Sequence, residues 1–385
     1  MNAHRTSVYL LVVTAICLIV LGLVMLSSTS AYAPESHGSA MFLLKRQVVW
    51  LGIGVVVCAV AAMVDYHYLQ KTWWIWFVLS VFLLALCFVP HICHRINGSR
   101  RWINIGVTFQ PSEFAKLSAI VAVAWWFARD EAYARQFLRG YVAPLVASGI
   151  LMGLIAPEVD MGTTALIGAT TFLLMFIAGT RLFYLLPTVA AGLAGLIFVA
   201  LKMPQRFGRM MAFMYPDKYP TEAYQTVQGL IALGSGGVEG LGLGNGRQKM
   251  MYLPFAHTDF IFPVIGEEMG LRITLAIVFT YIVFILCGAI IAMRARDRFG
   301  MLLGFGIVVI IALQAAVNIG VTTALLPNKG LPLPFISYGG SNLVFCLLGV
   351  GILINIYRQG LNDKDEQKNI VMRARTRNAR RVVRL

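Results

Sequence analysis

The sequence predicts an all-α polytopic membrane protein of about ten transmembrane helices. The first observation is composition, because 58% of the residues are hydrophobic and only 13% are charged, whereas soluble domains carry roughly 25% charged residues. The second is the recurrence of apolar runs close to the length of about 20 residues that crosses a bilayer. We therefore expect one transmembrane domain over residues 1–357 and a cytoplasmic polybasic tail over residues 358–385.

Ten apolar runs are close in length to the range of about 17 to 25 residues expected of a membrane helix. The predicted spans, in chain order, are 8–27, 47–64, 72–90, 112–128, 141–156, 163–180, 182–201, 269–293, 301–325 and 341–357. Spans five to seven are the least distinct, because the sequence between them is almost continuously apolar. A large extracytoplasmic loop at about 202–268 separates span seven from span eight.

The distribution of basic residues predicts that both termini are cytoplasmic, because Lys and Arg are concentrated in cytoplasmic loops. The tail alone carries nine of the 32 Lys and Arg residues, and we expect it to be flexible and attracted to anionic lipid headgroups. The net charge of +15 does not indicate nucleic acid as a partner, since no binding motif or aromatic groove accompanies it.

Nine basic residues lie on the outer side, against this bias. They are Arg95, Arg100, Arg101, Lys202, Arg206, Arg209, Lys218, Arg247 and Lys249. Solvation of an aqueous loop explains any one of them. Taken together they favour a site for an anionic headgroup, because arginine binds phosphate oxygens through two hydrogen bonds.

Charged residues also occur inside span four, after Pro111, which suits a first helical turn. Glu113 and Lys116 are three residues apart, so they share one helix face and can form an ion pair. Two interpretations remain open. The pair either fixes the helix in the bundle, or it lines an open cavity and positions a reactive group.

The polar stretch 240–270 contains the best candidate for chemistry. Its alternating glycines lack the βαβ context of a dinucleotide fingerprint, so they predict a tight turn. Asp259 is the candidate general base, because desolvation would raise its pKa while nearby cations would restrain that rise. A helix N-cap is its alternative role. Glu267 and Glu268 are predicted to be turn and helix-start residues.

Three further features complete the chain. Glu158 and Asp160 are predicted to cap a helix, since two acids are too few to indicate a metal site. The stretch 325–342 contains three prolines and predicts a rigid loop that forms a wall of the outer cleft. The six cysteines show neither CxxC nor metal-ligand spacing, so we expect them to be small core side chains.

Several blocks of the sequence resemble the SEDS family (shape, elongation, division and sporulation), and their residues are more similar to its FtsW branch than to its RodA branch. The matching blocks are SRRWINIG with QPSEFAK at 99–116, EVDMGTT at 158–164, YQTVQGLIALGSGG at 224–237, GLGNGRQKMMYLP with HTDFIFPVIGEE at 242–268, and KGLPLPFISYGGS at 329–341. Two positions depart from the family pattern. Phe255 replaces a frequent glutamate, which removes a carboxylate or metal ligand, and Val159 replaces a proline.

The resemblance implies a peptidoglycan glycosyltransferase in the bacterial inner membrane, with its active site on the outer face. Such an enzyme polymerises lipid II during cell division, inverts the anomeric carbon and releases undecaprenyl pyrophosphate. Asp259 matches the family's essential acid, and Glu113 and Lys116 match its span-four pair, with His257 in support. The candidate substrate-binding residues are Arg100, Arg101, Arg247, Lys249, Lys329 and Ser337.

The resemblance implies lipid II, a class B penicillin-binding transpeptidase and other division proteins as partners. It leaves open whether a divalent cation such as Mg²⁺ or Mn²⁺ takes part. Two other functions suit the same sequence. A helical bundle with an internal ion pair and a polar outer cleft also suits a lipid II flippase, although broken helices and an internal repeat are not visible in the sequence. The third alternative is a non-enzymatic scaffold for the transpeptidase.

Overall fold

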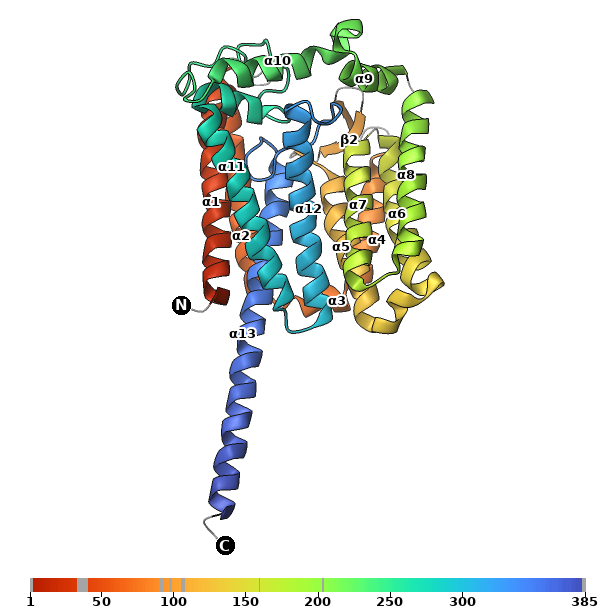
Figure 1. Cartoon of the computed structure of the whole chain (residues 1–385), viewed down its shortest axis with the longest axis vertical. Coiled ribbons are helices and arrows are strands. Elements are labelled where there is room, and N and C mark those ends of the chain that lie inside the picture. Colours follow the sequence, from red (N-terminus) through yellow and green to blue (C-terminus); the bar gives the residue numbers. More distant parts are fainter. Residues whose placement is uncertain are drawn as a thin grey trace.

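The structure, a computed structural model, describes residues 3–32, 41–89, 93–96, 99–104, 108–158, 160–202 and 204–382. It is a bundle of long helices with both termini toward one end and a helical cap over the other (Figure 1). The long helices are α1 (Ala3–Ser30), α2 (Phe42–Met63), α4 (Trp73–Leu86), α5 (Pro111–Arg129), α6 (Ala143–Ile155), α7 (Met161–Ala178), α8 (Leu182–Lys202), α11 (Ile261–Met293), α12 (Arg298–Thr322) and α13 (Gly340–Val382). Each of the ten predicted spans coincides with one of them.

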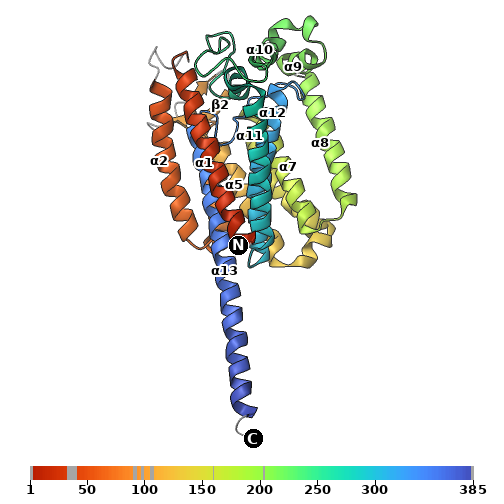
Figure 2. The ribbon, with the colours of Figure 1, turned by 60° about the vertical axis from the view of Figure 1, so that its left-hand side comes forward.

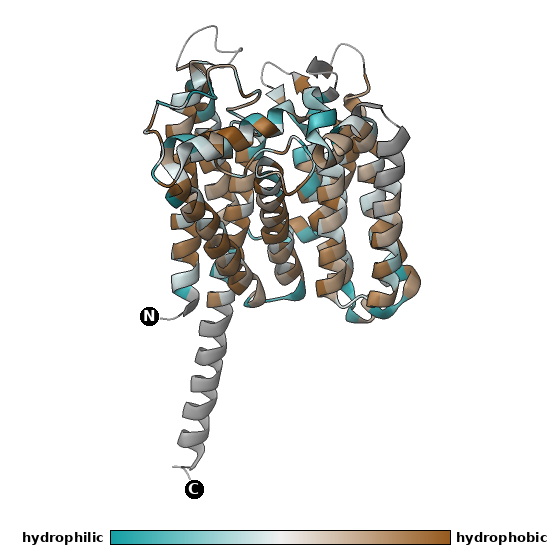
Figure 3. Ribbon diagram, turned by 45° about the horizontal axis from the view of Figure 1, so that its top comes forward, coloured by the Kyte–Doolittle hydropathy of each residue, from teal (hydrophilic) through white to brown (hydrophobic). Residues whose placement is uncertain are grey.

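The bundle has the length and composition of a membrane domain. Within the described residues, seven helices are long and apolar enough to cross a membrane. Two shorter apolar helices, Trp73–Leu86 and Leu182–Gly192, accompany them. Hydrophobic residues predominate along the helices, while hydrophilic residues gather toward the two ends (Figure 3). The predicted polytopic fold is therefore confirmed.

The predicted large loop forms the cap. Two helices, α9 (Pro204–Met214) and α10 (Pro220–Gly236), lie across the end of the bundle, and irregular chain leads from them into α11 (Figures 1 and 2). Helix α11 begins at Ile261, earlier than the predicted 269, because its first turns are buried against protein. Non-helical backbone at Gly270 (φ 75°, ψ −177°) separates these turns from the membrane part of the helix.

The segment before α5 adds a small antiparallel sheet to the otherwise helical fold. Its strands are β1 (Cys93–Ile96), β2 (Ser99–Asn104) and β3 (Thr108–Phe109), in the order β1-β2-β3. Ile103 of β2 is completely buried and pairs with Cys93 and Phe109. Strands this short present too little alternation to be recognised in a sequence.

Short helical segments complete the structure. They are α3 (His67–Lys71), the 3-10 turns Glu131–Arg135, Ala156–Glu158 and Pro216–Lys218, and the π-helical turn Phe137–Val142. Helix α13 continues beyond the bundle to Val382 (Figure 1), so the described backbone of the predicted tail is helical. The physical reason is composition, because residues 361–382 contain neither glycine nor proline.

Candidate active site

Asp259 lies in the last turn of irregular chain before α11, and helix α12 holds that turn in place. The buried side chain of Asn318, on α12, donates one hydrogen bond to the backbone oxygen of Asp259 at 2.8 Å and another to that of Leu331 at 2.7 Å. One amide therefore joins two loops, which we name the Asp259 segment (254–260) and the proline loop (326–339). The residue that caps α11 is Phe260, so Asp259 is not its N-cap.

The proline loop forms one wall of the site around Asp259, as the sequence predicts. Ser337 Oγ donates to the Thr258 oxygen at 2.6 Å, and the Tyr338 amide donates to the His257 oxygen at 3.0 Å. Gly330 lies directly against the Asp259 carboxylate, since a Cβ at this position would collide with Asp259 Oδ2.

The charge of Asp259 depends on groups from three elements. Burial raises the pKa of Asp259 from its ordinary value of 3.8 to about 6, and the positive charges of Arg101 and His257 oppose that rise. Asp160 raises the same pKa further through its negative charge. Arg101 belongs to β2 and Asp160 precedes α7, so the sheet and α7 both contribute to the site. This balance of desolvation against nearby cations is the one predicted.

Asp160 is the N-cap of α7, which confirms its predicted role. Its carboxylate accepts hydrogen bonds from the amide and hydroxyl of Thr163 at 3.2 and 2.9 Å, and from Gln110 Nε2 at 3.1 Å. Ser112 Oγ, in the first turn of α5, donates to it at 3.2 Å. The carboxylate thus joins α5 to α7. Glu158 ends the preceding 3-10 turn and caps no helix among the described residues.

The predicted ion pair in span four is confirmed. Glu113 Oε2 and Lys116 Nζ are 2.8 Å apart, and both side chains are buried. Asn342 of α13 donates to Glu113 at 3.1 Å, and Lys116 donates to Gln314 of α12 at 2.8 Å. Because Gln314 also donates to the Pro332 oxygen at 2.8 Å, the pair is connected to the proline loop. A small cavity adjoins both charged side chains.

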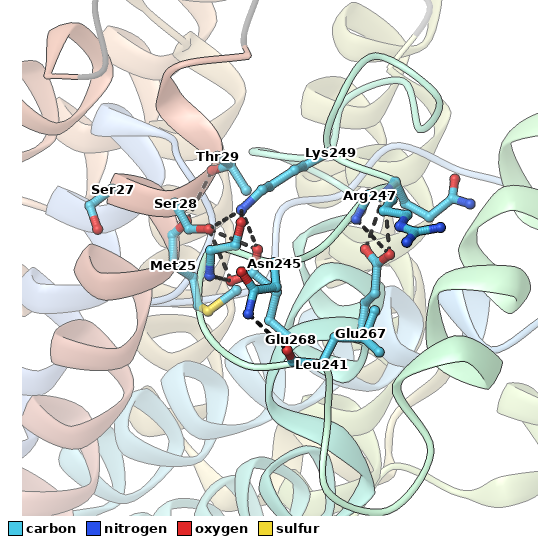
Figure 4. Close-up of polar contacts among 12 residues, drawn as sticks. Met25, Ser27, Ser28, Thr29, Leu241, Asn245, Arg247, Lys249, Glu267 and Glu268 are labelled. Carbon is cyan, nitrogen blue, oxygen red and sulfur yellow. Dashed lines mark hydrogen bonds and ion pairs between the residues drawn. The ribbon is translucent and has the colours of Figure 1, made fainter.

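Lys249, predicted to bind substrate, lies instead in a buried cluster that fastens the cap to α1 (Figure 4). Its ammonium contacts Glu268 Oε1 at 2.5 Å, Ser28 Oγ at 2.7 Å and the Gly244 oxygen at 2.8 Å. Ser28 in turn donates to both oxygens of Glu268 at 2.8 and 2.9 Å. We name Lys249, Glu268 and Ser28 the cap clamp.

The glycine-rich stretch forms the predicted tight turns, since Gly240, Gly242 and Gly244 all have positive φ. Its backbone wraps around the first turns of α11. The amides of Arg247 and Gln248 donate to the Glu267 carboxylate at 2.8 and 3.2 Å. Glu267, like Glu268, therefore organises the turn, as expected. Neither is a helix-start residue, because α11 begins six residues before Glu267, at Ile261.

The remaining predicted substrate residues are placed differently from one another. Ser337 Oγ is committed to protein groups, because it donates to Thr258 and accepts from the Leu333 amide at 2.8 Å. The Arg247 side chain is exposed at the cap, and Lys329 is half-buried beside Gly330. The side chain of Arg100 lies outside the described residues, as does Val159.

Sequence reasoning missed Asn318 and Gln314, which link α12 to the two loops of the site. The available signal was an amide side chain inside an apolar span, because such a group requires a buried hydrogen-bond partner. For the divalent cation left open above, no group of three or more His, Cys, Asp or Glu side chains in the described part of the chain is arranged to hold a metal ion. We therefore derive no step through a metal.

Comparisons with known proteins agree on one family. Residues 8–361 match the family model for FtsW, RodA and SpoVE, described as cell cycle protein. A relative in Geobacter sp. (strain M18), named "Probable peptidoglycan glycosyltransferase FtsW", is 39% identical over 345 residues, covering 89% of this chain and 94% of that protein.

Two solved structures are similar to the whole bundle. The first is a chain of a peptidoglycan synthase complex, solved for the coordination of polymerization and crosslinking, with a TM-score of 0.76 and 27% identity over 91% of this chain and 97% of that one. The second is a mutant of the rod shape determining protein RodA of Thermus thermophilus, with a TM-score of 0.68 and 26% identity over 90% and 96% of the two chains.

Proposed function

The chain belongs to the FtsW, RodA and SpoVE family, and on that premise we propose that it is a peptidoglycan glycosyltransferase that polymerises lipid II during cell division. The observation that carries the proposal is the setting of Asp259. Its half-buried carboxylate has a pKa of about 6, lies against the proline loop and faces the charge of Arg101. A carboxylate whose pKa is close to the working pH is suited to accept a proton in a transition state.

In the proposed reaction, two lipid II molecules meet at the cap end of the bundle. Asp259 takes the proton of the acceptor sugar's 4-hydroxyl while the oxygen of that hydroxyl attacks the donor's anomeric carbon. The new β-1,4 bond forms with inversion, and undecaprenyl pyrophosphate leaves. His257, next but one to Asp259 in the same segment, helps to keep the carboxylate ionised.

Arg101 is the best-supported ligand for the departing pyrophosphate. It projects from β2 near Asp259, and its buried Nε has no hydrogen-bond partner among the described residues. A fixed positive charge is effective where negative charge develops in the transition state. Arg100, Arg247 and Lys329 remain candidates for the same role. The proposed substrate contacts do not include Lys249 and Ser337, because their polar atoms bind protein groups.

The proposed setting is the bacterial inner membrane, with the cap and Asp259 on the outer face and both termini in the cytoplasm. The similarity to a chain of a complex that couples polymerization with crosslinking supports a crosslinking partner. The partner proposed here is a class B penicillin-binding transpeptidase, together with other division proteins.

The test is polymerisation of labelled lipid II by the purified full-length protein, with and without the transpeptidase. The Asp259→Asn variant, which keeps the side chain's size, should fold and bind lipid II but form no polymer. Substantial polymer from this variant would remove Asp259 from the mechanism. Movement of lipid II between leaflets without polymer would instead support the flippase alternative. If the protein shows neither activity, the scaffold alternative is supported.

A further inference from the structure

Gln47 is a buried amide on α2, a helix that buries few of its residues. The buried residues of α2 are Leu43, Gln47 and Gly54, and Gln47 is only 3% exposed. The residues that follow it, Val48 and Val49, are exposed. A buried amide is costly unless it is hydrogen-bonded, and an apolar side chain would serve for close packing alone. The glutamine therefore points to a specific polar partner.

That partner is the backbone at the end of the proline loop. Gln47 Nε2 donates a hydrogen bond to the Ser337 oxygen at 3.4 Å, and the Gly339 amide donates one to Gln47 Oε1 at 3.3 Å. One side chain thus binds the backbone on both sides of Tyr338. Helix α2 is separated from this loop by almost 300 positions in the sequence, so the contact is a feature of the fold and not of local structure.

Helix α2 is a fixed support for this contact, because it lies tightly along α13. A Cβ at Gly340, the first residue of α13, would collide with the indole of Trp50. A Cβ at Gly351 would collide with the backbone oxygen of Cys58. The two helices therefore have little room to slide past each other, and Gln47 stays at the level of the proline loop.

The part of the loop that Gln47 holds is also the part that contacts the Asp259 segment. Ser337 Oγ and the Tyr338 amide donate to backbone oxygens of that segment at 2.6 and 3.0 Å. Asn318 binds the opposite end of the proline loop. The loop is therefore held at its two ends by buried amides from two different helices, α12 and α2.

We propose that Gln47 is a positioning residue for the glycosyl transfer, acting on Asp259 through the proline loop. The inference rests on the proposed function, since it takes Asp259 as the general base. Asn318 fixes the distance between the two loops, and Gln47 fixes the turn by which the proline loop contacts the Asp259 segment. Without Gln47 the carboxylate is still present and charged, but it is less often aligned with the acceptor hydroxyl. Small misalignments of reacting groups lower the rate strongly.

The test is the Gln47→Met variant of the full-length protein, because the unbranched, adaptable methionine side chain fills the space without the two hydrogen bonds. Initial rates of lipid II polymerisation at a series of lipid II concentrations give kcat and KM separately. We expect kcat to fall by about tenfold or more. KM should change by less than about twofold, since no proposed substrate contact is altered. Gln47→Asn, whose amide is too short to make both bonds, should lose kcat in the same way.

Gly54→Ala is the matched control, because it disturbs the packing of α2 on α13 without touching the proline loop. Gly54 is another buried residue of α2, and a Cβ there would collide with Leu347 Cδ1 of α13. This variant should have a lower midpoint of thermal unfolding but the kcat of the parent. An equal loss of kcat in Gly54→Ala and Gln47→Met would show that any loosening of α2 has the same effect, and would overturn the inference.

Hydrogen–deuterium exchange gives a readout that does not depend on polymerisation. In Gln47→Met, peptides that cover the proline loop and the Asp259 segment should exchange faster than in the parent, and peptides of α12 should be unchanged. Unchanged exchange in the loop, a parental kcat, or a raised KM with a parental kcat would each overturn the positioning role. No polymer from the parent would reject the proposed function, whereas the exchange rates would still show whether Gln47 holds the loop.

Discussion

At the scale of single residues, the position of Asp259 is set by its backbone and its charge is set by its surroundings. Asn318 and the proline loop fix the peptide, while burial, Arg101, His257 and Asp160 determine the pKa. The position and the charge of the carboxylate are therefore determined by different groups. A substitution that changes the charge of a neighbour should therefore alter the pH dependence of the reaction without displacing the carboxylate.

The pH profile of kcat/KM should have an acid limb with an apparent pKa of about 6. Below that pH, Asp259 carries a proton and cannot take one from the acceptor hydroxyl. Because Arg101 lowers this pKa, Arg101→Gln should move the limb to higher pH. The measurement is the initial rate of lipid II polymerisation between pH 4.5 and 8, compared with Arg181→Gln, which changes an exposed arginine in the turn between α7 and α8. An acid limb that does not move in Arg101→Gln would exclude Arg101 from the setting of Asp259.

The cap clamp should be worth far more to stability than an exposed ion pair of the same loop. Glu268→Gln leaves the Lys249 ammonium buried without its counter-charge, which typically costs about 3 to 5 kcal/mol. Glu239→Gln removes the exposed pair of Glu239 with Arg272, which are 3.3 Å apart, and should cost less than about 1 kcal/mol. Thermal unfolding in one detergent measures both, and equal losses of stability would contradict a buried clamp.

At the scale of elements, a contact between two residues can be predicted from the sequence when the two residues lie close together in the chain. The pairing of Glu113 with Lys116 and the capping by Asp160 involve residues three apart, so the local pattern already contains them. The cap clamp joins Ser28 to Lys249 across 221 positions. Nothing local marks such a contact, and that is why Lys249 looked available for substrate. The membrane helices were predictable because their signal is length and apolarity alone.

The packing of α10 against α11 depends on one glycine. A Cβ at Gly236 would collide with the Gly266 backbone oxygen, whereas a Cβ at Gly234, two residues earlier in the same helix, meets nothing within 4 Å. Gly236→Ala should lower stability by about 1 to 3 kcal/mol, as overpacking does. Gly234→Ala should be neutral or stabilising by up to about 1 kcal/mol, because alanine favours a helix. Thermal unfolding of both variants checks this, and similar values for the two would show that α10 does not depend on close contact.

At the scale of the whole molecule, ten crossings place both ends of the chain on one side of the membrane, and nine would place them on opposite sides. Figure 1 shows the amino terminus at the end of the bundle away from the cap, and α13 leaving the bundle at that same end. In the expected orientation, a position in the cap therefore lies outside the cytoplasm and a position after the tail lies in the cytoplasm.

Reporter fusions should distinguish these arrangements. Alkaline phosphatase, which is active only outside the cytoplasm, should be active when inserted after Lys218 in the cap and inactive when fused after Leu385. Green fluorescent protein should show the reverse pattern. With a cytoplasmic amino terminus, phosphatase activity after Leu385 but not after Lys218 would mean nine crossings and would require one of spans five to seven to be reassigned.

The link from Asn318 to both the Asp259 segment and the proline loop has a consequence for the bilayer around the protein. Both walls of the site are tied to α12, so their separation is set by one rigid helix rather than by the tilt of its neighbours. Membrane helices accommodate a change in lipid thickness chiefly by tilting. The spacing across the site should then be insensitive to the acyl-chain length of the surrounding lipids, while the outer helices of the bundle adapt to it.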